Sequence, residues 1–348
     1  MEKKTTIYHI ANETNLSIAT VSRVINNKGG YSKETEQKVL DTIRKLGYSP
    51  SSSAQSLASS STRTIGLIYN FSRNFNSGED YLVQFLSGVT AATNQYNYDI
   101  LLDSNSIKQH VDAPSIINRG RFDGIVLPAL SSYGHNLVKG LLSYDFPVVY
   151  TGPKLEDDEK GCNVYGGYGL YKREVLELLY KKGHRHIVFF EAYNYDDDFN
   201  YNDFNNIIEL KQIINSFCSE KDLPHDQCRL ILYDYSSLNQ FQLLVEDVLS
   251  ANDRPDAISI DSTRSVNIAY NVIQRLHLRI PGDISIISTS HQKRIGEEFS
   301  PALSIVYVNA FEMGKSAAEL LISKIEKFEN KAPKYIPYQM IVRNSIKL

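Results

Sequence analysis

The stretch TIYHIANETNLSIATVSRVI, residues 6–25, decides the fold of the amino-terminal part of this chain. Its apolar and small residues recur twice at the spacing of one helix face, on either side of Asn15 and Leu16. Asn is one of the few non-glycine residues that enter the left-handed conformation of a tight turn. The stretch therefore predicts two short helices joined by a tight turn. The residues on the two faces are Ile7, Ile10, Ala11 and Thr14, and then Val21, Val24 and Ile25.

A third helix is predicted further along by the apolar residues Val39, Leu40, Ile43 and Leu46. Each of the three helices is preceded by a hydroxyl residue that can cap free backbone amides, namely Thr6, Ser17 and Ser32. Residues 1–49 are therefore predicted to form an all-α helix-turn-helix domain.

The second helix of such a domain can enter the DNA major groove. Arg23 on its outer face can donate two parallel hydrogen bonds to guanine O6 and N7, and Ile18 and Ala19 suit thymine methyl groups. The full set of outward residues is Ile18, Ala19, Ser22 and Arg23. Residues placed to hold phosphates are Thr6, Ser17 and Thr20. A three-helix module that binds another protein remains the alternative.

The charge distribution agrees with a DNA-binding head. The chain has a formal net charge of −3, but residues 1–63 hold nine lysines and arginines against five acids, and the rest holds 28 against 35. A basic segment on an acidic body indicates that only the head meets a polyanion.

The rest of the chain has a different organisation. Residues 50–63 are rich in serine and predict a linker, in which Ala54, Leu57 and Ala58 allow one or two helical turns. Residues 64–348 alternate short β-branched runs with amphipathic helical stretches, which predicts an α/β body with parallel sheets in two subdomains. The runs include 65–69, 99–103, 124–128, 148–152, 186–190, 229–233, 256–260 and 283–287, and between them lie helical stretches such as 81–95, 168–182, 205–218, 237–250 and 264–277.

The whole chain resembles the lactose-repressor (LacI/GalR) family of transcriptional regulators. The head carries IATVSRVIN, YSKET and LGYSP. The likeness continues through SAQSLASSSTRTIGLI, FDGIVLP, KKGHRHIVFF, LRIPGDISIIS, PALSIV, EMGKSAAELLI and IVRNSI. The resemblance implies a repressor that binds a near-palindromic operator on double-stranded DNA as a homodimer. It also implies that Ile18, Ala19 and Arg23 read bases, and that Leu57, beside Ala54, wedges into the minor groove.

For residues 64–348 the resemblance implies a periplasmic-binding-protein-like fold that closes over a small-molecule effector, often a sugar. The sequence departs from the family where charged residues usually hold sugar hydroxyls: at Thr263, at the turn Ser288–His291, and after the run 186–190. With 23 tyrosines and no tryptophan, tyrosine is the stacking residue that also has a polar tip. The predicted effector contacts are Tyr69, Tyr81, Tyr195, Ser262 and Ser290.

Other functional classes are disfavoured. There is no P-loop, nucleophile elbow or His-Glu-x-x-His motif, so neither an enzyme nor a cofactor is predicted. The acidic runs 156–159 and 196–198 lack calcium-loop spacing, so no metal is expected. No apolar run of about 18 residues predicts a membrane span. Three scattered cysteines and the absence of an export signal favour the cytoplasm. The remaining alternatives are a non-sugar effector, a protein corepressor, and an extracytoplasmic sugar-binding protein.

Overall fold

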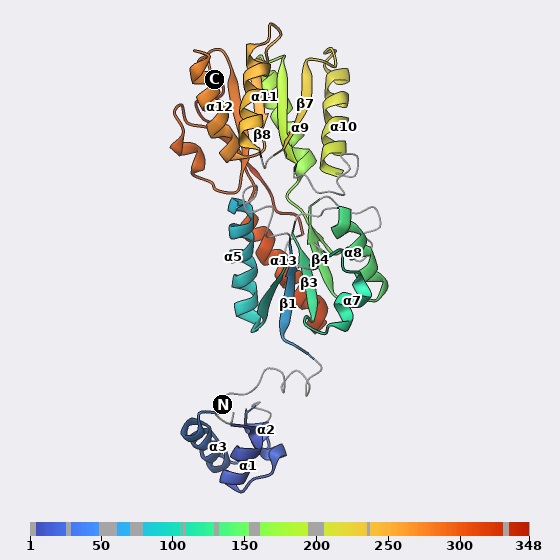
Figure 1. The fold of residues 1–348 in the computed structure, drawn as a ribbon, viewed down its shortest axis with the longest axis vertical. Helices are drawn as coiled ribbons and strands as arrows, with labels where there is room; N and C mark the ends of the chain where they lie inside the picture. The colour runs from blue at the N-terminus through green and yellow to red at the C-terminus, as the bar shows by residue number, and fades with distance from the viewer. Residues whose placement is uncertain are drawn as a thin grey trace. The chain divides into compact units, whose positions relative to one another are not determined.

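The computed structural model describes residues 5–25, 29–48, 61–69, 79–104, 106, 109–128, 132–152, 161–193, 205–234, 237–329 and 334–347. The chain divides into two compact units, Met1–Arg63 and Thr64–Leu348, referred to below as the head and the body (Figure 1).

The head contains the three predicted helices, which are confirmed as α1 (Ile7–Thr14), α2 (Ile18–Ile25) and α3 (Lys33–Leu46). Asn15 adopts the left-handed conformation, with φ of 54°, and so makes the turn between α1 and α2. Ser17 Oγ accepts a hydrogen bond from the Thr20 amide at 3.1 Å, as expected of a cap. The same bond from Thr35 to Ser32 begins α3.

The body contains two sheets, as predicted for an α/β fold with two subdomains. The first sheet is parallel in the order β2-β1-β3-β4-β5. Its strands are β1 (Thr64–Ile68), β2 (Asp99–Asp103), β3 (Gly124–Leu127), β4 (Val148–Thr151) and β5 (Asn163–Val164). Helices α5 (Glu79–Tyr96) and α13 (Ala310–Glu326) cover one face, and α7 (Ala113–Asn118) and α8 (Ser132–Ser143) cover the other.

The second sheet has the order β11-β10-β9-β8-β6-β7, and only β10 and β11 pair antiparallel. Its strands are β6 (Ile187–Tyr193), β7 (Cys228–Asp234), β8 (Ala257–Ile260), β9 (Ser285–Ser290), β10 (Ser304–Tyr307) and β11 (Gln339–Ile341). The helices around it are α9 (Tyr168–Lys181), α10 (Asn205–Glu220), α11 (Leu238–Ser250) and α12 (Thr263–Arg275), with a short 3₁₀ turn, η2 (Ile295–Glu298).

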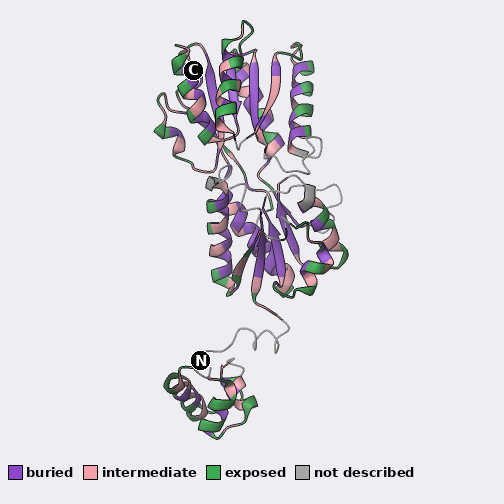
Figure 2. Ribbon diagram, viewed as in Figure 1, coloured by how far each residue is buried: buried purple, intermediate pink, exposed green. Residues whose placement is uncertain are grey.

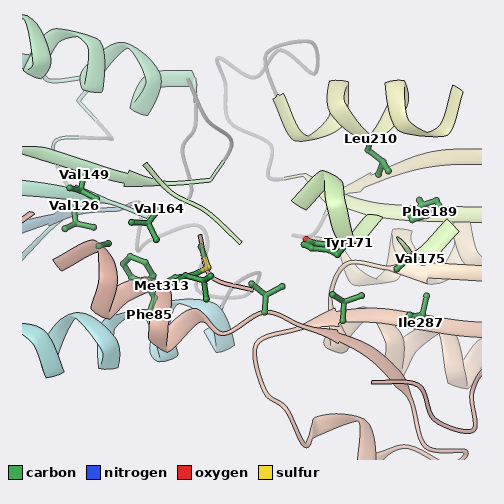
Figure 3. Close-up of a cluster of buried hydrophobic side chains, with 14 of the residues drawn as sticks. Phe85, Val126, Val149, Val164, Tyr171, Val175, Phe189, Leu210, Ile287 and Met313 are labelled. Carbon is green, nitrogen blue, oxygen red and sulfur yellow. The ribbon is translucent and has the colours of Figure 1, made fainter. Parts of the chain in front are cut away.

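The two sheets share one apolar core. Buried side chains on β3, β4 and α5 belong to the same cluster as buried side chains on α9, β6 and β9 (Figure 3). The chain passes between the sheets after β5, after β10 and after α13. The central strands of both sheets are buried, whereas the outer faces of the helices are exposed (Figure 2).

The turn between α9 and β6 buries a histidine. His184 is 2% exposed, and its Nδ1 lies 3.2 Å from Asp256 Oδ1. The turn folds back on α9, where the His184 amide donates to Leu179 O at 3.0 Å.

Helices α5 and α13 approach so closely that both contain an obligatory glycine. A Cβ at Gly88 would collide with the carbonyl oxygen of Phe311, and one at Gly314 would collide with that of Phe85. Backbone atoms cannot rotate away as a side chain can, so this contact depends on the two glycines.

We predict that Gly88→Ala destabilises the body by about 1–3 kcal/mol, because the added methyl group overpacks a helix contact. Thermal or urea unfolding of the full chain measures the effect. The control is Ser87→Ala, since Ser87 lies on the same helix but is exposed. Equal stability of the two variants would contradict the close approach of α5 and α13.

Candidate nucleic-acid interface and effector site

Helix α2 has one buried face and one face open to solvent. Val21 and Val24 pack into the core of the head, and they are 0% and 6% exposed. Ile18 on the opposite face is 41% exposed, which is unusual for a large apolar side chain. Ala19 and Arg23 are also exposed, and Ser22 is half-buried. The predicted base-reading residues therefore share the face of α2 that the head leaves uncovered.

The guanidinium of Arg23 lies close to Gly30, in the segment that follows α2. A Cβ added at Gly30 would lie 3.5 Å from Arg23 Nη1. Its guanidinium is nevertheless exposed, so its donors stay available to a base edge.

The residues predicted to hold phosphates lie at the starts of α1 and α2. The hydroxyls of Ser17 and Thr20 are 2.9 Å apart. The Thr6 amide donates to Nδ1 of His9 at 3.0 Å. Ala54 and Leu57, predicted to contact the operator, lie outside the described residues.

The predicted effector residues lie at or next to the carboxyl ends of the parallel strands, where ligands bind in such folds. Tyr69 follows β1, Ser290 ends β9, and Ser262 lies between β8 and the start of α12. Ser290 Oγ accepts from the Gln292 amide at 3.1 Å and so shapes the turn after β9. Tyr195 lies outside the described residues.

Tyr81 on α5 joins the two sheets at this edge. Its hydroxyl lies 2.9 Å from Thr151 Oγ1, at the end of β4. Its ring packs edge-on against His291, directly after β9, with centroids 4.9 Å apart. Burial raises the pKa of Tyr81, so the phenol stays neutral. Of the predicted effector residues, the structure thus brings Tyr81 close to the turn that holds Ser290.

The second sheet contains a buried ionic network that was not predicted from the sequence. Lys172 of α9 forms an ion pair with Glu191 of β6, and their side chains are 1% and 8% exposed. The hydroxyl of Tyr168 donates to the other oxygen of Glu191 at 2.9 Å. Lys172 Nζ also lies 5.3 Å from the centroid of the Tyr168 ring. A signal was present, since Lys172 shares a helix face with Val175, Leu176 and Leu179.

Asp261 extends this network from the end of β8. Its Oδ2 accepts from the Ala192 amide at 2.7 Å, and its Oδ1 accepts from the Tyr233 hydroxyl at 2.8 Å. Burial, and then the negative charge of Glu191, raise the pKa of Asp261 to about 7. Asp261 is therefore an acid that changes charge near neutral pH.

The described part of the chain contains no group of three or more His, Cys, Asp or Glu residues able to hold a metal ion. None of its helices is long and apolar enough to cross a membrane.

Two family models match the chain. Residues 6–51 match "Bacterial regulatory proteins, lacI family", and residues 176–346 match "Periplasmic binding protein-like domain". The chain belongs to the lacI family. It is accordingly a DNA-binding transcriptional regulator.

Known proteins resemble this lacI-family chain over nearly its whole length. Catabolite control protein A of Priestia megaterium is 26% identical over 324 residues, which cover 92% of this chain and 93% of that protein. The fold is that of the lac repressor dimer bound to operator and the anti-inducer ONPF, with a TM-score of 0.79, 16% identity, and coverage of 99% and 100%. A complex of the transcriptional regulator CelR with cellobiose has a TM-score of 0.67, 21% identity, and coverage of 98% and 100%.

For the head of this lacI-family protein, we predict that Arg23→Ala lowers discrimination between operator and unrelated duplex by about 1–3 kcal/mol, because a bidentate base contact is lost. Competition gel shifts measure the discrimination. Circular dichroism of the variant should be unchanged, since Arg23 is exposed.

Arg44→Ala is the matched control, because Arg44 is an exposed arginine of α3. If Arg23→Ala discriminates between operator and unrelated duplex as well as the unmodified protein does, Arg23 does not read bases.

For the body, we predict that Lys172→Met destabilises the fold by about 3–5 kcal/mol, because it leaves Glu191 buried and unpaired. The double variant Lys172→Met, Glu191→Gln should regain most of that loss, since neither member of the pair is then charged. Urea unfolding measures both.

The control is Lys45→Met, because the Lys45–Glu13 pair is solvent-exposed and contributes little. A single variant as stable as the double variant would show that Lys172 and Glu191 are not paired as described.

Proposed function

We propose that this protein is a repressor that binds a near-palindromic operator as a homodimer and is controlled by a small carbohydrate. The observation that carries the proposal is the uncovered face of α2, where Ile18 and Arg23 are exposed although their helix is packed into a folded domain. An apolar side chain and a guanidinium on one exposed helix face suit the major groove, which offers thymine methyls and guanine acceptors.

Two copies are proposed because a single short helix reads too few base pairs for a specific site. A two-fold dimer doubles the contacts, and its symmetry is mirrored in the operator. The lac repressor, which has the same fold, forms a dimer bound to operator, and this supports the arrangement.

Control by a carbohydrate rests on hydroxyl-bearing and aromatic side chains at the carboxyl ends of the strands, among them Tyr81, Thr151 and Ser290. The cellobiose complex of CelR supports a sugar. An effector acts by binding one conformation of the body more tightly than another. A non-sugar effector or a protein corepressor is the second candidate, favoured by the neutral turn Ser288–His291.

The proposal includes three domains, with a head at 1–49, a hinge at 50–63 and a body at 64–348. It also includes a cytoplasmic location and no enzymatic activity. Relatives named as transcriptional regulators support a regulatory role rather than an enzymatic one. Because an extracytoplasmic sugar-binding protein has no use for a DNA-reading head, that alternative is the weakest.

The test is fluorescence anisotropy of the full chain on duplexes selected from a random pool. Specific binding should weaken steeply with salt, with log K falling by about 0.9 per unit of log salt for each phosphate contacted. One of a panel of neutral sugars should change operator affinity at least fivefold. No preference among duplexes would refute DNA reading, and a preference that no sugar alters would refute carbohydrate control alone.

We predict that Leu57→Ala weakens operator binding by about 1–3 kcal/mol, because a minor-groove wedge is lost. Binding to unrelated DNA should stay the same, since phosphate contacts remain. The same anisotropy assay measures both, with Ser59→Ala as the control in the linker. If the operator affinity of Leu57→Ala is unaltered, Leu57 does not act as a minor-groove wedge.

A further inference from the structure

His9 holds the residue that begins the first helix of the head. The backbone amide of Thr6 donates a hydrogen bond to Nδ1 of His9 at 3.0 Å, and the Thr6 hydroxyl lies 2.8 Å from the same atom. His9 is the third residue of α1, the position from which a glutamate or glutamine usually accepts this bond. The head thus has a histidine, which gains a positive charge below neutral pH, where a capping box normally has a carboxylate or an amide.

The bond from Thr6 fixes the form of the His9 ring. A ring nitrogen that accepts a hydrogen bond carries no proton, so the neutral ring has its proton on Nε2. In the protonated ring Nδ1 also carries a proton, so it can donate to the Thr6 hydroxyl but cannot accept from the Thr6 amide. Protonation therefore adds one positive charge and frees the amide of Thr6, a residue predicted to hold a DNA phosphate.

The ionisable groups around His9 do not pair with it. The others on α1 are Tyr8 and Glu13, and Glu13 accepts a hydrogen bond from Lys45 of α3 at 2.8 Å. The cation of α2, Arg23, belongs to the predicted base-reading face. His9 itself is exposed, so a charge on its ring acts on the surroundings of the head.

His9 is also the only histidine in residues 1–63. Histidine is the side chain whose charge ordinarily changes between about pH 5 and pH 8. A change in the charge of the side chains of the head within that range is therefore assigned to one residue.

Operator binding changes the surroundings of His9 in one direction. Freeing the Thr6 amide, and placing a cation near the amino-terminus of α1, cost the same with and without DNA, so these costs cancel when the two states are compared. The phosphates of DNA are present only in the complex, and they favour the positively charged ring. The first helix of a helix-turn-helix crosses the DNA backbone, which brings the start of α1 within reach of these phosphates. Because coupling is reciprocal, a proton that DNA stabilises on His9 strengthens DNA binding to the same extent.

We propose that His9 makes operator affinity depend on pH, because its protonation adds a positive charge and frees the Thr6 amide beside the DNA backbone. Affinity is lower where His9 is neutral, and it rises as the pH falls through the range in which histidine takes up a proton. The inference goes beyond the proposed function, which contains no control by pH, and it relies only on DNA binding by the head.

The test is fluorescence anisotropy of the full chain on its operator at about pH 7.5 and about pH 5.5, at several salt concentrations. The deciding quantity is the ratio of the affinities at the two pH values. We expect the affinity of the unmodified protein to be about threefold or more higher at the lower pH. The plot of log K against log salt should also be steeper there, by up to about 0.9, which is the value for one further phosphate neutralised.

His9→Gln is the deciding variant, because glutamine at this position still accepts the bond from the Thr6 amide but has no charge to change. Its ratio of affinities should be about threefold or more smaller than that of the unmodified protein. His225→Gln is the control, since His225 is an exposed histidine of the body, and it should keep the full pH dependence. If His9→Gln prefers the operator but keeps the unmodified pH dependence, this inference is refuted while the proposed function stands.

Proton uptake tests the same claim without a variant, should His9→Gln not fold. Titration calorimetry of the unmodified chain with its operator, at about pH 6.5 in two buffers of different ionisation enthalpy, counts the protons taken up on binding. The account predicts uptake of part of one proton for each head bound. Release of protons, or heats that do not depend on the buffer, would overturn the proposal.

Discussion

The packing of Val21 and Val24 into the small core of the head is the constraint on which the functional account depends. A helix of eight residues cannot bury all its sides, so fixing these two valines decides which side chains remain outside. The turn at Asn15 sets the direction in which α2 leaves α1. The exposure of Ile18 and Arg23 follows from these local contacts.

The body follows a different rule, because parallel strands bring all their carboxyl ends to one edge. Residues distant in sequence, such as Tyr81, Thr151 and His291, meet there. The chain crosses between the two sheets more than once, and the sheets share one core. A small molecule bound at that edge can therefore act on both sheets. The buried pair of Lys172 and Glu191 is a further local constraint, because the loss of either partner leaves a buried charge unpaired.

Much of this architecture is predictable from sequence, because periodicity reports local burial. The three helices of the head and the β-branched runs of the body agree with the structure to within a few residues. The packing of α13 on α5 could not be predicted, because the close approach of Gly314 to Phe85 is a tertiary contact that local periodicity does not report. The hydrogen bonds of Asp261 could not be predicted for a similar reason, since its partners Ala192 and Tyr233 lie on other strands. Leu57 and Tyr195 remain predictions outside the described residues.

The central claim, that the outer face of α2 lies in the major groove, is tested most directly by dimethyl sulfate footprinting of the bound operator. Guanine N7 lies in the major groove and adenine N3 in the minor groove, so the two reactivities report the grooves separately. The account predicts guanine N7 protection at two places related by a two-fold axis. Guanines that stay fully reactive throughout a saturated operator would contradict it.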